Sequence, residues 1–231
     1  MTKKRIWELD ALRGLCILAM VVIHLIFDLS GVVALPIARH PVFVWVKEQG
    51  GVLFLLLSGI CVTLGTHSLR RGAIVLGCGM LCSLVTAVMQ RLGFLSYFMV
   101  IRFGVLHCLG VCMLLWPLCK RLPPWLLTVF GVAILAAGFY FETVTVSATW
   151  LYPLGLTAPL FSSGDYFPLA PNLGWFLLGA ALGRRVYANK TSRFPNAGQN
   201  PILRALCFCG RHSLFIYLLH QPLITGLMML L

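Results

Sequence analysis

The first apolar run of the chain carries polar residues whose types and spacing could support chemistry. Arg13, His24 and Asp28 fall within it, and Asp10 stands just before it. On an α-helix Arg13 and His24, eleven positions apart, project within roughly 20° of one another. Asp28 follows His24 by four residues, a spacing that brings two helical side chains together. An imidazole beside a carboxylate is the arrangement of a general base and the group that orients it, and a guanidinium is suited to phosphate.

The composition places these residues in a membrane. Of 231 residues, 60% are apolar and only 10% are charged, whereas soluble domains carry about 25% charged residues. The chain therefore lacks the polar residues needed to cover a soluble surface, and we expect an integral membrane protein with a single domain over residues 1–231. Ionisable groups at membrane depth are unfavourable, so they usually mark a site or a pathway.

The apolar runs predict an all-α fold, a polytopic bundle of about seven transmembrane helices. A span of about 20 apolar residues crosses the hydrocarbon core of a bilayer. On that measure the predicted spans are residues 11–32, 46–66, 72–90, 98–119, 123–142, 168–187 and 208–230.

The basic residues predict the orientation. The net charge is +12, but the 18 Lys and Arg residues occur as short clusters between apolar runs, which argues against nucleic acid as a partner. Most of them fall in the N-terminal segment and in the loops on the same side of the membrane. The positive-inside rule therefore predicts a cytoplasmic N-terminus in a multi-pass protein of the cell membrane. The nine cysteines include no Cys-x-x-Cys pair, and we interpret them as packing residues without a metal.

A second group of polar residues is predicted at the outer side. Arg102 and His107 open the span at 98–119, and Asp165 closes a long segment, 143–167, that has no Lys or Arg. A loop of this length between tightly joined helices is often a lid or a binding surface. Asp165 has two interpretations: it caps the following helix, or it binds a polar acceptor or pairs with Arg102.

The last apolar run repeats the pattern of the first. Ser213, Tyr217 and His220 follow the spacing i, i+4, i+7 and so share one helix face, with Gln221 beside them. Arg211 opens this helix on the cytoplasmic side. The first and last helices thus each present a cation near the inner surface and a histidine deeper in the membrane, an arrangement suited to an anionic cofactor inside.

At these residues the sequence resembles a known family. The opening Arg5-Ile-Trp-Glu-Leu-Asp10-Ala-Leu-Arg13-Gly14, with His24 and Asp28, is similar to the bacterial branch of the heparan-α-glucosaminide N-acetyltransferase catalytic family. The spacing of Arg13 and His24 also matches the Arg-x10-His signature of bacterial membrane O-acyltransferases. Further motifs that carry the resemblance are Ser58-Gly59, Phe103-Gly-Val-Leu-His107, Asp165-Tyr-Phe-Pro168, Gly210-Arg-His-Ser-Leu214 and His220-Gln-Pro222.

The resemblance implies transfer of an acetyl group from cytoplasmic acetyl-CoA to a sugar hydroxyl or amine. It implies His24 as general base or acyl carrier, assisted by Asp28. It leaves open whether His40, in the loop after the first helix, is the base instead, as in the lysosomal members. The residues expected to bind the donor are Arg13, Arg211, Ser213 and His220. Those expected to bind the acceptor are Arg102, His107, Asp165, Tyr217 and Gln221.

A second hypothesis belongs to another functional class. The His24 and Asp28 stripe would also suit a small proton-coupled transporter that uses it as a relay, although the sequence shows no internal repeat. Under the acyltransferase hypothesis the partners are the lipid bilayer, acetyl-CoA and a carbohydrate-type acceptor. The sequence leaves the acceptor, N- versus O-acetylation and assembly open, a homodimer among the options.

Overall fold

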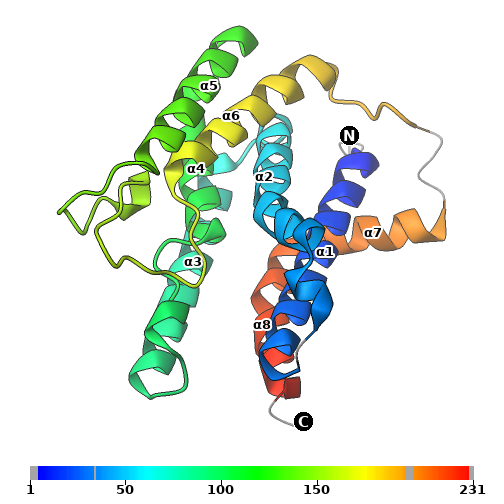
Figure 1. Cartoon of the computed structure of the whole chain (residues 1–231). Coiled ribbons are helices and arrows are strands. Elements are labelled where there is room, and N and C mark those ends of the chain that lie inside the picture. The colour runs from blue at the N-terminus through cyan, green and yellow to red at the C-terminus, as the bar shows by residue number, and fades with distance from the viewer. Residues whose placement is uncertain (1–4, 34, 196–199, 229–231) are drawn as a thin grey trace. The chain divides into compact units, whose positions relative to one another are not determined.

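The computed structural model describes residues 5–33, 35–195 and 200–228, and most of these residues are helical (Figure 1). They form no β-strand, only two isolated β-bridges, and so the predicted all-α fold is confirmed. The α-helices are α1 (Trp7–Val32), α2 (Pro41–Leu64), α3 (Ser68–Arg91), α4 (Val105–Cys119), α5 (Pro124–Phe141), α6 (Leu169–Val186), α7 (Pro201–Arg211) and α8 (Ser213–Met228). Three 3-10 helices are η1 (Pro36–Arg39), η2 (Tyr97–Met99) and η3 (Tyr152–Leu154).

The helices confirm the membrane character, but they match the seven predicted spans only in part. Among the described residues, four helices are long and apolar enough to cross a bilayer: α1, α2, α3 and α5. A fifth span results if α7 and α8, bent by 82° at a short break, are counted as one. The predicted span at 98–119 contains the shorter α4, because residues 100–104 are not helical and the α-helix begins only at Val105.

The described chain divides into two compact units. The first combines the segment up to Leu57 with the segment from Tyr187 onward, and the second runs from Ser58 to Val186. Helix α2 contributes residues to both units. The candidate residues of the first and last apolar runs therefore belong to one unit, and those at 102–107 and 165 belong to the other.

Two glycines bring α1 and α7 into backbone contact in the first unit. A Cβ on Gly14 would overlap the carbonyl of Leu206, and a Cβ on Gly210 would overlap the carbonyl of Asp10. Small residues that let helix backbones approach closely are a common device of membrane helix packing. The thiol of Cys207 also donates to the carbonyl of Trp7, at 3.3 Å. The start of α1 is thereby fixed against α7.

Hydrogen bonds at the start of α1 hold residues 192–194, which precede α7 in the chain. The buried carboxylate of Glu8, 7% exposed, accepts hydrogen bonds from Ser192 Oγ (2.8 Å) and from the backbone N–H of Arg193 (2.7 Å). The indole of Trp7 donates to the carbonyl of Phe194 at 2.7 Å. A buried carboxylate that accepts two hydrogen bonds is well satisfied. These contacts therefore stabilise the position of residues 192–194 against the start of α1.

Glycines also set the packing of the second unit, where α3 packs on α4 and α5 packs on α6. A Cβ on Gly174 would lie 2.7 Å from the carbonyl of Gly131 on α5, and one on Gly183 would lie 2.9 Å from the backbone of Ile60 on α2. The core between these helices includes Phe176 and Leu127, both fully buried. Gly174 and Gly183 belong to the small-residue face that the sequence indicates for residues 168–187.

Candidate active site

Four of the predicted site residues meet in the first unit. Nδ1 of His24 on α1 lies 3.0 Å from Nε2 of His220 and 3.2 Å from Oε1 of Gln221, both on α8. The amide nitrogen of Gln221 donates to Oδ2 of Asp28 at 2.7 Å. His220 is buried, at 7% exposure, and the other three side chains are half-buried. The contacts between α1 and α8 thus join the two histidines, the amide and the carboxylate in one network.

The partners of this network determine where the protons lie. Nδ1 of His220 faces the backbone carbonyl of Tyr217, an obligate acceptor, so this nitrogen carries the proton and Nε2 of neutral His220 is an acceptor. The bond to Asp28 fixes the Gln221 amide with its nitrogen toward the carboxylate, so Oε1 faces His24. Both atoms next to Nδ1 of His24 are therefore acceptors. His24, when neutral, carries its proton on Nδ1.

This tautomer leaves Nε2 of His24 with a free lone pair. No hydrogen bond to that nitrogen from any described residue is present. A neutral imidazole held at Nδ1–H by acceptors, with Nε2 unprotonated, is the form of histidine that abstracts a proton or attacks a carbonyl carbon. The amide oxygen that accepts from Nδ1–H belongs to a side chain whose nitrogen is in turn bonded to the carboxylate of Asp28, so the orientation of the amide is fixed.

Of the residues predicted to bind the acetyl donor, Arg13 and Arg211 lie at the crossing of α1 and α7, and Ser213 lies at the start of α8. Arg13 is the chain neighbour of Gly14, and Arg211 is the chain neighbour of Gly210, so the glycine contact sets both arginines at one level along α1. Arg211 is exposed at the end of α7, and Ser213 begins α8. At a rise of 1.5 Å per residue, Arg13 precedes His24 by about 16 Å along the helix.

His40, the alternative base, has a different environment. It is exposed, it directly follows η1, and its Nδ1 accepts a hydrogen bond from the backbone N–H of Val42 at 3.3 Å. This contact lies at the first turn of α2, where backbone N–H groups lack helical partners. The surroundings of His40 are those of a residue that caps a helix, and the described residues place no carboxylate or second imidazole against it.

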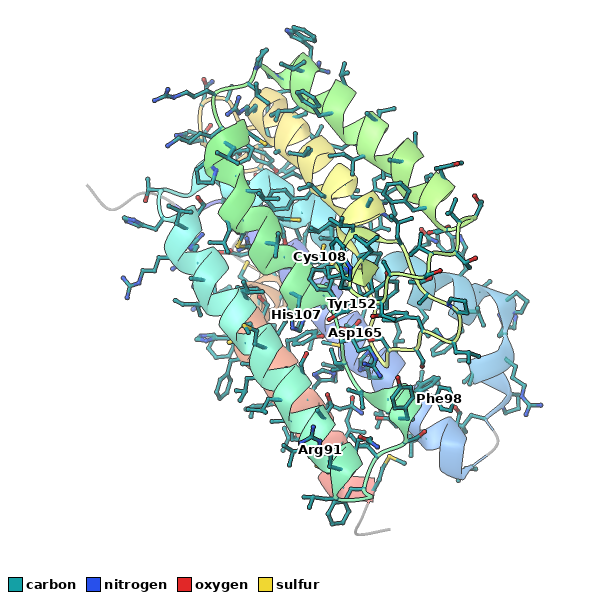
Figure 2. All side chains as sticks on the ribbon, turned by 90° about the vertical axis from the view of Figure 1, so that its left-hand side faces the viewer. Arg91, Phe98, His107, Cys108, Tyr152 and Asp165 are labelled. Carbon is teal, nitrogen blue, oxygen red and sulfur yellow. The ribbon has the colours of Figure 1, made fainter. Side chains whose placement is uncertain are left out.

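Asp165 lies at the start of α4 in the second unit, where Figure 2 labels it close to His107, and its carboxylate caps that helix. Its Oδ2 accepts a hydrogen bond from the backbone N–H of Val105 at 3.0 Å. A Cβ at Gly104 would overlap the same carboxylate, so glycine is required there. A negative charge at a helix N-terminus is favourable because it satisfies free N–H groups and complements the helix dipole.

His107 is also engaged at the start of α4. The backbone N–H of Gly104 donates to its Nδ1 at 3.2 Å, so neutral His107 carries its proton on Nε2. Nε2 in turn lies 3.2 Å from Oγ of Ser83 on α3 and donates to it. Both ring nitrogens of this buried residue are used. Ser83 accepts from the imidazole, so this pair does not have the proton arrangement of an activated serine nucleophile.

Arg102 joins two chain segments beside the start of α4, residues 100–104 and residues 162–165. Its Nε donates to the carbonyl of Ser162 at 2.9 Å, and its backbone N–H donates to Oγ of Ser163 at 3.0 Å. The guanidinium carbon lies 4.7 Å from the centre of the Tyr97 ring, a cation–π contact. Oγ of Ser163 donates to the carbonyl of Asp165 at 2.6 Å. These bonds hold residues 162–165 beside residues 100–104.

The long segment 143–167 has its own aromatic core. The rings of Tyr152 and Phe161 stack with centres 5.3 Å apart, and those of Phe161 and Tyr166 lie 4.9 Å apart. The hydroxyl of Tyr166 donates to the carbonyl of Tyr152 at 2.7 Å. Burial, together with the nearby Tyr152, raises the pKa of Tyr166 to about 12, so this hydroxyl remains a donor at physiological pH. The segment is therefore an ordered structure packed beside α4, not a loose connection.

The cap on α4 leads to a stability prediction. Replacement of Asp165 by Ala removes the acceptor for the Val105 N–H and should lower the free energy of unfolding by about 1 kcal/mol. Asp165→Asn retains an acceptor oxygen and should restore part of this loss. The measurement is unfolding of the purified protein in mixed micelles, with Glu142→Gln, an exposed acidic residue of the same unit, as control. Equal losses in Asp165→Ala and Asp165→Asn would contradict the capping role.

The sequence also carries a helix-start signal before α7. Asn200 caps α7 by accepting from the N–H of Ile202 at 2.8 Å, and Pro201 occupies the first helical position. This pair is a recognisable helix start, and it could have revealed the break within 208–230. Glu8 lies in the quoted opening motif, but its partners Ser192 and Arg193 are too distant in sequence for spacing to identify them.

Comparison with known proteins identifies a family that matches most of the chain. The family model described as heparan-alpha-glucosaminide N-acetyltransferase, catalytic, matches residues 5–222 of the 231-residue chain. No curated protein and no solved structure shows significant similarity to the chain. The matched range includes every helix from α1 to α7 and the part of α8 that carries His220 and Gln221.

Proposed function

Because the chain belongs to the heparan-alpha-glucosaminide N-acetyltransferase catalytic family, a family of membrane acetyltransferases, we propose that it moves an acetyl group from acetyl-CoA to a sugar or amino-sugar acceptor. The single observation that carries the mechanism is the free Nε2 of His24, held in position by His220 and Gln221. The proposed location is the cell membrane, with the donor on the cytoplasmic side.

The proposed reaction requires one basic atom. Nε2 of His24 removes a proton from the acceptor hydroxyl or amine as that group attacks the thioester carbonyl carbon of acetyl-CoA. The bond from the acceptor to the acetyl group forms, the carbon–sulfur bond breaks, and the proton passes from His24 to the departing thiolate. If an acetyl-histidine forms first, the same nitrogen makes the bond. Both routes use the unprotonated Nε2.

The other residues of the network position the base in this proposal. Gln221 holds the Nδ1–H side of His24 and transmits the charge of Asp28, because its amide bonds both. His220, fixed by the carbonyl of Tyr217, keeps the imidazole of His24 oriented. We assign His220, Gln221 and Tyr217 to this positioning rather than to direct contact with donor or acceptor, a change from the roles that the sequence indicates.

Arg13, Arg211 and Ser213 are proposed to bind the phosphates of CoA. The support is their position at the α1–α7 crossing and at the start of α8, about 16 Å along α1 from the base. CoA is an elongated molecule with its phosphates far from its thioester, which fits a separation of this size. In the second unit, the hydrogen bonds of His107 and Asp165 support a role in fixing α4.

The proposal is tested without knowledge of the acceptor by adding CoA to the purified protein in detergent. We expect CoA to raise the melting temperature, since a ligand that binds only the folded state stabilises it. Arg13→Ala should weaken the apparent affinity for CoA about 10-fold, in line with loss of a charge-assisted hydrogen bond. Arg70→Ala, at an exposed arginine in the other unit, is the matched control. A wild-type protein that is not stabilised by CoA would contradict the proposal.

The positioning role of Gln221 gives a kinetic prediction. Gln221→Leu should lower kcat by about 10- to 100-fold, as expected for loss of a group that orients a reacting side chain, with the KM for acetyl-CoA nearly unchanged. Asp28 acts only through this amide in the proposal. The double variant Asp28→Asn/Gln221→Leu should therefore be no slower than Gln221→Leu alone. Additive losses in kcat would show that Asp28 acts independently of Gln221.

The transporter hypothesis receives less support from the geometry. A proton relay from His24 to Asp28 would have to pass through the side-chain amide of Gln221, which bonds both groups. An amide donates and accepts hydrogen bonds, but it does not titrate near neutral pH. The same arrangement suits a base whose Nδ1–H is held in place, and so we retain the acetyltransferase proposal.

A further inference from the structure

Helix α7 turns sharply away from the helix that follows it. The axes of α7 and α8 differ by 82° across the break between Arg211 and Ser213 (Figure 1). Helix α8 is apolar and is the part of this pair that reaches the candidate active site through His220. If α8 runs through the bilayer, an angle of 82° sets α7 nearly parallel to the membrane plane.

The crossing of α7 with α1 fixes the depth of α7. The glycine contact joins α7 to α1 at Gly14, and the apolar remainder of α1 extends from Leu15 to Val32. Eighteen residues at 1.5 Å each span about 27 Å, close to the thickness of the hydrocarbon core. Helix α7 therefore lies at the end of the hydrophobic part of α1, where headgroups begin.

The face of α7 that the protein leaves uncovered is amphipathic. Leu203, Leu206 and Gly210 face the interior of the unit, whereas Ile202 is 70% exposed and Phe208 is 56% exposed. On the helical wheel Arg204 lies at one edge of the exposed face, Phe208 and Ala205 in its centre and Ile202 at the other edge. An exposed face with a basic edge and bulky apolar residues is typical of helices that lie in the membrane interface.

Charge indicates which lipids would meet this face. Helix α7 contains two arginines, and residues 201–228 contain no Asp or Glu. Arg211, next to the glycine contact, is assigned above to the acetyl donor. Arg204 lies seven residues earlier, about 10 Å along the helix, and is exposed. No described residue forms an ion pair with it, so its charge is free to bind a lipid phosphate.

We propose that α7 is an in-plane anchor that binds the anionic phospholipids of the leaflet on its side. Arg204 pairs with the lipid headgroup, and Ile202 and Phe208 insert at the boundary between headgroups and acyl chains. The occupant is the lipid leaflet itself and not a second protein. Because α7 is in contact with α1 at Gly14, this anchor also fixes the depth of the helix that carries His24. The proposal rests on the membrane character of the chain and does not depend on the acetyltransferase mechanism.

The test uses the full chain in nanodiscs of equal parts phosphatidylglycerol and phosphatidylcholine. Phe208 is replaced by the photo-crosslinker p-benzoylphenylalanine, and lipid adducts are identified by mass spectrometry after irradiation. The control carries the same crosslinker at Leu223, which is 67% exposed and about 15 Å along α8 from Ser213. A crosslinker at Leu223 should meet acyl chains and report no headgroup preference.

The expected result is a lipid adduct at position 208 enriched in phosphatidylglycerol relative to position 223. One arginine near an anionic surface corresponds to about fivefold enrichment. Arg204→Gln should lower the ratio of phosphatidylglycerol to phosphatidylcholine adducts at position 208 until it equals the ratio at position 223. Arg70→Gln should leave the ratio at position 208 unchanged. Adducts at 208 with protein instead of lipid, equal ratios at both positions, or a ratio insensitive to Arg204→Gln would each overturn the proposal.

Discussion

Replacement of His24 by Ala is expected to lower the rate of acetyl transfer by about 10²- to 10⁴-fold, the usual contribution of a general base, while the protein still binds CoA. The physical reason is the loss of Nε2, the unprotonated nitrogen that the contacts of Nδ1 with His220 and Gln221 leave free. The measurement is the initial rate of acetyl transfer by the purified variant in nanodiscs, alongside its melting temperature with and without CoA.

The matched control is His40→Ala. His40 is exposed and accepts a hydrogen bond from the backbone of Val42, so its removal should leave the rate of acetyl transfer close to that of the wild type. A fast His24→Ala variant together with a slow His40→Ala variant would move the base to the loop before α2 and contradict the role of the network on α1 and α8.

Substitution of Gly210 by Ala should strongly destabilise the first unit. A Cβ at this position overlaps the carbonyl of Asp10 on α1, and backbone atoms can move aside only by separating α1 from α7. Overpacking of a close contact lowers stability by about 1–3 kcal/mol. The measurement is the free energy of unfolding in mixed micelles, together with the rate of acetyl transfer, because α1 carries His24.

Gly226→Ala provides a control of opposite sign in the same unit. Apart from the adjacent residues and the backbone of its own helix, no described atom lies within 4 Å of the position that a Cβ would take at Gly226 on α8. Alanine is favoured over glycine within a helix by about 0.5–1 kcal/mol, so this substitution should leave the protein as stable as before or more stable. If both alanine variants behave alike, the proposed backbone contact at Gly210 is wrong.

The sequence predicted the features that depend on local pattern. Apolar runs locate the helices, and the spacing of His24 and Asp28 identifies one face of α1 because helical geometry is fixed over a few turns. The clustering of His220 and Gln221 with His24 could be suspected only from the repeated pattern of the first and last runs. The structure brings them together through the packing of α1 on α8.

The roles within each cluster could not be read from the sequence, because they depend on contacts between distant residues. Gln221 seemed suited to the acceptor, yet its amide lies between His24 and Asp28. Asp165 was expected to cap the helix that follows it, to bind a polar acceptor or to pair with Arg102; the structure shows that it caps α4, sixty residues before it, and binding of an acceptor stays a prediction. The break before α8 was missed because apolar composition alone cannot distinguish a straight span from two helices at 82°.

The most direct test of the central claim is transfer of a radiolabelled acetyl group from acetyl-CoA to a panel of amino sugars and saccharides by the wild-type protein in nanodiscs. We predict labelled product from at least one acceptor, with CoA released in equal amount and both signals lost in His24→Ala. Labelled product formed equally by wild type and His24→Ala, or CoA-binding wild-type protein that acetylates none of the acceptors, would contradict the claim.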